Sequence, residues 1–133
     1  MSNNTSSFLA NDRFASYVGI KLLEVKPGYA VAKLKIQNKH LNAANIVQGG
    51  VTFTLADFAF AAASNSHGQL SLGISAYITY YKPPRGKELI AKANEIHRNG
   101  KMSTYHVDVF DENMETIARF TGNAFSKNDH IIQ

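Results

Sequence analysis

Every second residue is apolar along much of the chain, which is typical of β-strands that bury one face. Between residues 29 and 36, for example, Lys33 and Lys35 alternate with apolar side chains. Turn-forming pairs such as Pro27-Gly28 and Asn99-Gly100 separate the alternating segments. The pattern predicts strands over residues 19–26, 29–36, 72–82, 89–97, 103–110 and 116–125.

Residues 48–66 break this alternation, because apolar side chains occupy every side of a helical projection there. We expect one long buried helix that begins at Gly49-Gly50 and closes around Asn65 to Gly68. The order is then two strands, a helix, and four strands in a meander. It favours an α+β fold in which one antiparallel sheet wraps around a central helix.

The remaining segments are short. A helix is predicted over residues 12–17, a long loop over 37–47, and a loose N-terminal tail over 1–11. We see no internal repeat or low-complexity stretch, so we interpret residues 1–133 as a single domain.

The composition is that of a globular protein, with 44% apolar and 18% charged residues and no cysteine. The five histidines are scattered without the spacing of metal ligands. The start of the chain has no signal-peptide pattern, and the longest apolar run, residues 58–63, is too short to cross a bilayer. We therefore expect a cytoplasmic protein with no metal, no cofactor and no membrane partner.

The net charge of +4 comes mainly from residues 1–39, which hold six basic and two acidic side chains. An excess of this size suits an anionic ligand. Neither an aromatic-rich RNA motif nor a zinc-finger spacing accompanies it, so we expect no nucleic-acid partner.

One acidic residue interrupts an otherwise uncharged stretch. Between Lys39 and Lys82 lie 42 residues, and Asp57 is the only charged side chain among them, although the chain average of 18% would give seven or eight. Asp57 falls in the middle of the apolar helix, where aspartate is a poor helix former and burial of its charge is costly. Burial would raise the pKa of the carboxylate, and such carboxylates cluster at functional sites. A side chain that points to solvent or caps a backbone group is the alternative.

The two glycines at the start of the same helix give Asp57 a chemical context. Glycine at a helix N-terminus lets another molecule approach the free backbone N–H groups, which favour an anion or a polarised carbonyl oxygen. A glycine pair alone more often marks only a tight turn. Together with an acidic side chain on the same helix, Gly49 and Gly50 indicate carbonyl chemistry.

The segment from Asn42 to Gly68 resembles the signature of hotdog-fold acyl-CoA thioesterases, most closely their phenylacetate-degradation branch. The family pattern is Asn, then His-Gly-Gly, then Leu-x-Asp, then small residues ending near Asn-Ser-x-Gly. The likeness covers most of residues 14–126. This chain has, in the corresponding places, Asn42, Gln48-Gly49-Gly50, Leu55-Ala56-Asp57 and Asn65-Ser66-His67-Gly68.

The resemblance implies that the Gly49 N–H polarises the thioester carbonyl. It makes Asp57 the nucleophile or the general base, two routes that stay open, and gives Asn42 the task of holding the carbonyl or the attacking water. Gln48 stands where the family usually has histidine. Glutamine can donate and accept hydrogen bonds but cannot shuttle a proton.

In some relatives a serine or threonine assists the carboxylate, in one branch a helical turn after it. This chain has Ala61 at that position, and Ser71 and Ser75 are both candidate substitutes.

The implied substrate is an acyl-CoA with an aryl or medium-chain acyl group, held in part by Gln48 and Gly50. Basic residues at strand ends would bind the CoA phosphates, although solvating those ends is their alternative role. These residues are Lys82, Arg85, Arg98 and Lys101.

The distance between Gly49 and Asp57 predicts a shared site. Eight residues separate them, which is about 12 Å along a helix. One straight helix cannot bring both to a single carbon, whereas two antiparallel copies can, so we expect a homodimer that shares its active sites. The resemblance further implies a homotetramer.

Two other functions remain open. A non-catalytic acyl-CoA binding module is one, and the presence of Asp57 argues against it. A hotdog dehydratase or hydratase is the other, and such enzymes generally pair a carboxylate with a histidine where this chain has Gln48.

Overall fold

The computed structural model describes the backbone of residues 3–131 and the side chains of 5–128 and 131. Within this part, six strands form one antiparallel sheet. The strands are β1 (Ile20–Lys26), β2 (Tyr29–Lys35), β3 (Gln69–Tyr80), β4 (Glu88–Arg98), β5 (Met102–Asp111) and β6 (Thr116–His130). The helices are α1 (Asn3–Leu9), α2 (Arg13–Val18) and α3 (Gly49–Ser64), with a 3₁₀ turn at Asn38–His40.

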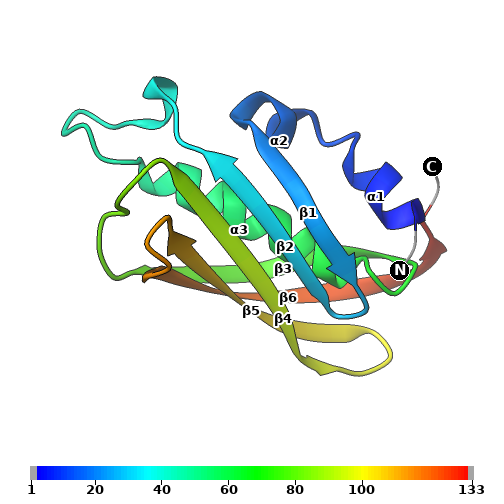
Figure 1. The fold of residues 1–133 in the computed structure, drawn as a ribbon. Coiled ribbons are helices and arrows are strands. Elements are labelled where there is room, and N and C mark those ends of the chain that lie inside the picture. The colour runs from blue at the N-terminus through cyan, green and yellow to red at the C-terminus, as the bar shows by residue number, and fades with distance from the viewer. Residues whose placement is uncertain (1–2, 132–133) are drawn as a thin grey trace.

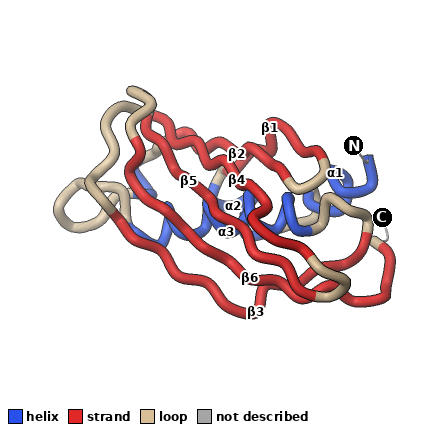
Figure 2. The backbone as a smooth tube through the Cα atoms, turned by 90° about the horizontal axis from the view of Figure 1, so that it is seen from below, coloured by secondary structure: helices blue, strands red, loops and turns tan. Residues whose placement is uncertain are grey.

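The long helix α3 runs along the sheet and contacts every strand (Figure 1). Seen from below, the strands form one curved layer with α3 on its inner side (Figure 2). The predicted sheet around one central helix is therefore confirmed. None of the helices in residues 3–131 is long and apolar enough to span a membrane.

The strand order is β1-β2-β4-β5-β6-β3, which corrects the predicted meander of four strands. Strands β4, β5 and β6 do follow one another, but β3 pairs with β6 and β4 pairs with β2. Pro83 and Pro84 lie in the β3–β4 connection, where proline opposes a tight hairpin. The connection instead carries the chain from one edge of the sheet to its middle.

The sheet buries one face against α3, as the alternating sequence predicted. In β5, Tyr105, Val107 and Val109 are fully buried, while the residues between them stay partly exposed. The Phe60 ring of α3 packs edge-on against Tyr105, with ring centroids 5.7 Å apart. A Cβ at Gly122 would lie 2.9 Å from the Phe60 ring, so glycine there leaves room for the ring.

The N-terminal segment differs from the predicted loose tail. Residues 3–9 form helix α1, and Thr5 and Leu9 are buried. The Thr5 hydroxyl donates to the Asn65 carbonyl oxygen at 3.0 Å, which ties α1 to the end of α3. The segment is ordered because its few apolar and hydroxyl side chains find partners far along the chain, which local pattern does not reveal.

Candidate active site

Gln48 caps the N-terminus of α3. Its Oε1 accepts a hydrogen bond from the Gly50 N–H at 2.6 Å. Within the described part of the chain, no group accepts from the Gly49 N–H. A Cβ at Gly50 would lie 2.6 Å from the Gln48 Oε1, so glycine there makes this cap feasible. The Gly49 N–H is therefore available to polarise a ligand carbonyl.

Tyr80, at the end of β3, holds the other side of Gly49. Its hydroxyl donates to the Gly49 carbonyl oxygen at 2.9 Å, and a Cβ at Gly49 would lie 3.2 Å from the ring. Burial raises the pKa of Tyr80. Both residues line a cavity of about 370 Å³ together with Tyr81 and Lys82. The sequence alone did not identify Tyr80 as a site residue, because a contact 31 residues away leaves no local signal.

The loop before α3 is fixed by His40, which is 3% exposed. Its Nδ1 accepts from the Gln37 N–H at 2.8 Å, so its Nε2 carries the proton and donates to the Val18 carbonyl oxygen at 2.7 Å. The His40 carbonyl oxygen in turn accepts from the Gln48 N–H at 2.9 Å. His40 thereby anchors the loop to the end of α2 and sets where α3 begins.

Asn42 lies in the same loop and is exposed. Its Oδ1 accepts from the Ala44 N–H at 2.8 Å and from the Ile46 N–H at 3.1 Å. The oxygen is thus occupied in shaping the loop. The amide Nδ2 is the part of Asn42 that is left to donate to a carbonyl or to water.

Asp57 corrects the prediction of a fully buried helix, because its side chain is exposed in the single chain. Gly50, Thr54, Asp57 and Ala61 follow one another at helical spacing and form the stripe of α3 that the sheet leaves uncovered. Partial burial still raises the pKa of Asp57, and the charge of Asp12 raises it further. The direction matches the sequence prediction, although the burial is less than expected.

A cavity of about 380 Å³ adjoins Asp57. Its walls come from the segment around α1, from α3, and from the start of β3, where Ser71 contributes. Ser71 is 4% exposed, and its hydroxyl has no hydrogen-bond partner within the described residues. Asn65 fixes its backbone through two bonds, from the Ser71 N–H at 2.9 Å and to the Ser71 carbonyl oxygen at 3.1 Å.

Ser75, the other candidate helper, is placed differently. Its hydroxyl accepts from the Asn123 Nδ2 at 3.0 Å, and the Thr104 hydroxyl donates to the Asn123 Oδ1 at 2.6 Å. Within the described side chains, neither Ser71 nor Ser75 bonds to Asp57. The choice between them stays open.

The predicted phosphate-binding residues fall into two groups. Lys82 lies beside Gly49 and pairs with Glu115, and Arg85 follows in the same loop. Arg98 and Lys101 lie around the β4–β5 turn. The groups flank opposite ends of β4, whose eleven residues span roughly 33 Å. One chain therefore does not bring all four together, which the sequence pattern could not reveal.

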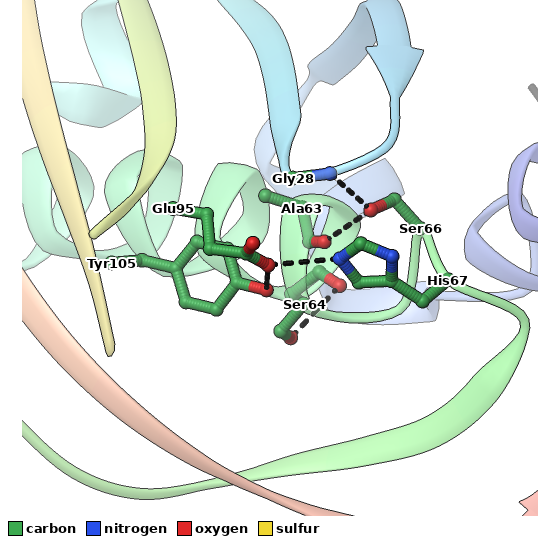
Figure 3. A network of polar contacts seen from close by, with 8 residues as sticks. Gly28, Ala63, Ser64, Ser66, His67, Glu95 and Tyr105 are labelled. Carbon is green, nitrogen blue, oxygen red and sulfur yellow. Dashed lines mark hydrogen bonds and ion pairs between the residues drawn. The ribbon is translucent and has the colours of Figure 1, made fainter. Parts of the chain in front are cut away.

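The end of α3 is held by a polar network (Figure 3). The Tyr105 hydroxyl donates to the Glu95 Oε1 at 2.7 Å, and the His67 Nε2 lies 2.8 Å from the same oxygen. Burial alone would raise the pKa of Glu95, but the bonds from Tyr105 and His67 lower it. The Gly28 N–H donates to the Ser66 hydroxyl at 2.8 Å. These contacts fix the segment that ends α3 against β4, β5 and the turn between β1 and β2.

Comparison with known proteins places the chain among relatives. A model of the thioesterase superfamily matches residues 44–118. A putative esterase of Archaeoglobus fulgidus is 41% identical over 120 residues, which cover 90% of this chain and 78% of that protein. The acyl-coenzyme A thioesterase PaaI of Escherichia coli is 30% identical over 122 residues, covering 91% and 87%. The structure of E. coli PaaI, from the phenylacetic acid degradation operon, aligns with a TM-score of 0.92 at 28% identity, over 97% of this chain and 94% of that one.

Proposed function

This chain belongs to the thioesterase superfamily and has its hotdog fold, and we propose that it hydrolyses an acyl-CoA thioester to a free acid and CoA. The acyl group is an aryl or medium-chain group, which suits the apolar cavity walls that Phe8, Phe60 and Leu72 supply beside Asp57. The observation that carries the proposal is the pairing on one helix of an uncommitted N–H at Gly49 with a lone carboxylate at Asp57.

In the proposed reaction, the thioester oxygen accepts a hydrogen bond from the Gly49 N–H, which stabilises the negative charge that develops there. Asp57 either attacks the carbonyl carbon or takes a proton from the attacking water. The carbon–sulfur bond breaks, and CoA leaves as a thiolate that takes up a proton. On the first route water then hydrolyses the acyl–Asp57 anhydride, and on the second Asp57 passes the proton from water to the leaving thiolate. Either way one water is consumed and Asp57 ends as the free carboxylate.

Two subunits form each site in this proposal. Gly49 and Asp57 lie eight residues apart, about 12 Å along a straight helix, which is too far for one carbonyl group. The start of β3 lines the Asp57 cavity, and Tyr80 at its end contacts Gly49. Two antiparallel β3 strands would set the Asp57 of one chain near the Gly49 of its partner. Pairing of such dimers gives a homotetramer.

CoA would enter beside Gly49, where Lys82 and Arg85 can meet its phosphates. Gln48 and Gly50 would bind the thioester end indirectly, since their mutual hydrogen bond keeps the Gly49 N–H available. Arg98 and Lys101 lie at the other end of β4, so their contact with CoA requires a partner chain. The place we propose for this activity is the cytoplasm, with degradation of phenylacetate-type acids as its setting.

The test is a panel of acyl-CoA substrates with a thiol reagent that reports free CoA. Thiol release is expected for at least one aryl or medium-chain acyl group. Binding without release would support the acyl-CoA binding module instead, and water addition to an enoyl-CoA would support a hydratase. Either result would contradict hydrolysis as the function.

Asp57→Asn tests the role of the carboxylate, because asparagine has nearly the same shape but is neither base nor nucleophile. We expect kcat to fall by about 10²–10⁴-fold. The variant should also melt at a higher temperature at neutral pH. Because folding raises the pKa of Asp57 above its usual value of 3.8, the ionised side chain opposes folding at any pH well above 3.8. The gain in melting temperature should therefore vanish as the pH falls towards 3.8, where the wild-type side chain becomes protonated. More than about a tenth of wild-type kcat in Asp57→Asn would contradict the assignment.

A further inference from the structure

The Asp57 cavity has a second acidic residue. Asp12, between α1 and α2, lines the same space of about 380 Å³ as Asp57. Its neighbours Phe8, Leu9 and Asn11 line it as well. The N-terminal segment therefore closes one side of the cavity that adjoins the proposed nucleophile or base.

None of the described residues that line the cavity is basic. The lining side chains from α1 and β3 are uncharged, and Asp57 is the one charged lining residue from α3. The neighbouring charged residues lie outside this cavity. Arg13 of α2 is exposed, and Glu24 of β1 lines an adjoining cavity. The Glu24 Oε2 lies 3.8 Å from the Lys26 Nζ. The two carboxylates are therefore like charges at the margin of one cavity.

The side chain of Asp12 is held in place by a hydrogen bond to the backbone of α2. Asp12 is the N-cap of α2, and its Oδ1 accepts from the Ala15 N–H at 2.9 Å. Upstream, Thr5 ties α1 to Asn65 at 3.0 Å, and Leu9 is buried. Moving the carboxylate away from the cavity would break this hydrogen bond and uncap α2.

We propose that Asp12 is a second carboxylate of the active site and a positioning residue that acts on the reaction through its charge on Asp57. This inference rests on the proposed role of Asp57 in thioester hydrolysis. Asp12 does not touch the substrate. Its charge makes proton uptake by Asp57 easier, so that Asp57 is the stronger base or nucleophile once it is ionised. Burial raises the pKa of Asp57 first, and the charge of Asp12 adds to it.

Asp12→Asn separates the charge from the cap, because asparagine caps a helix as well as aspartate does. The acid limb of the pH profile of kcat/KM should move to lower pH by on the order of one unit or less. The rate well below the midpoint should rise, up to about tenfold, while the rate on the plateau falls because the base is weaker. A merely structural role would lower the rate at every pH and would not make the two profiles cross.

Two controls accompany this test on the assembled protein. Glu24→Gln removes a carboxylate from the adjoining cavity and should leave the midpoint in place. The melting temperature of Asp12→Asn should not fall below that of the wild type, because asparagine keeps the cap and the repulsion of ionised Asp57 is removed. The proposal is overturned if the midpoint pH of the acid limb does not change in Asp12→Asn, or if it changes by the same amount in Glu24→Gln.

A second readout does not depend on turnover. The side-chain carboxyl carbon of Asp57, followed by NMR as the pH is changed, should titrate at lower pH in Asp12→Asn than in the wild type. An unchanged titration overturns the proposal. If Asp57→Asn remained active, the proposed hydrolytic role would fail, whereas the NMR titration would still report whether Asp12 acts on Asp57.

Discussion

The two edges of the sheet are protected in different ways. The β1 edge is seven residues long, its register shifts between Leu22 and Glu24, and α1 and α2 lie alongside it (Figure 1). The β3 edge is twelve residues long, and on the side away from β6 it has no neighbouring strand in the described chain. Its exposed apolar side chains are Leu72, Ile74, Tyr77 and Tyr80.

The difference indicates what each edge is for. A long edge strand with apolar side chains is a template for pairing, and proteins usually cover or charge such an edge. The N-terminal helices cover β1, whereas β3 is left bare along the strand that borders both the Asp57 cavity and Gly49. We infer that the bare edge is where the second subunit completes the site. The predictions below test this contrast.

The largest effect is expected when the β3 edge is charged. Ile74→Lys together with Tyr77→Lys places two cations on the bare edge, which should yield monomers. Each site then lacks either its N–H donor or its carboxylate, so kcat/KM should fall by about 100-fold or more. Light scattering gives the mass, and thiol release gives the rate.

The matched control charges the other edge. Leu23 of β1 is 54% exposed, so Leu23→Lys should change neither the mass nor the rate. A β3-edge variant that is monomeric yet fully active would refute the shared site.

Complementation tests the sharing directly. Asn42→Ala and Asp57→Asn should each be inactive alone, since each damages both sites of a dimer. Refolded together in equal amounts, half of the dimers should be mixed, and each mixed dimer has one intact site. About a quarter of wild-type activity should therefore return. Well-mixed dimers without recovered activity would mean that each site lies within one chain.

Residues that bind CoA should have smaller effects. Arg85→Ala should raise KM for an acyl-CoA by roughly fivefold or less, as expected for one exposed charge contact. Lys82→Ala should have less effect, because Lys82 already pairs with Glu115. Arg98→Ala should raise KM only in the assembled protein, since Arg98 lies at the far end of β4.

A short pantetheine-like thioester without the nucleotide separates these effects from damage to the fold. Its KM should hardly change in any of the three variants. Lys21→Ala on the β1 edge is the control, and KM for the acyl-CoA should not change. Equal changes for both substrates would mean that these residues do not bind the nucleotide.

Local pattern predicted the elements but not all of their neighbours. Alternation located the strands, and the uniformly apolar segment located α3, because both signals arise within a few residues. The pairing of β3 with β6 brings together residues such as Tyr77 and Thr121, and the docking of α1 on α3 uses the contact of Thr5 with Asn65, 60 residues apart. No window of the sequence contains such a contact.

The candidate site was predictable to a similar degree. Asp57 was conspicuous because its charge is isolated in the sequence, and Gly49 because glycine pairs mark close approach. Tyr80 and Asp12 gave no such signal, since their importance arises from where the fold places them. The expected burial of Asp57 was wrong for the single chain, because apolar composition alone does not tell which stripe of a helix the sheet covers.

The smallest effect concerns the start of β3. A buried hydroxyl without a partner opposes folding, so Ser71→Ala should raise the free energy of unfolding by about 1 kcal/mol. Ser66 is comparably buried at 3%, but its hydroxyl accepts from the Gly28 N–H and donates to the Ala63 carbonyl oxygen, so Ser66→Ala should lower the free energy of unfolding by about 1 kcal/mol. Urea unfolding measures both. If Ser71→Ala were instead destabilising, its hydroxyl would have a partner in the assembled protein. Ser71 lies on the bare edge strand and borders the Asp57 cavity. That partner would therefore belong to the second subunit, and the contact between the subunits would lie beside the carboxylate.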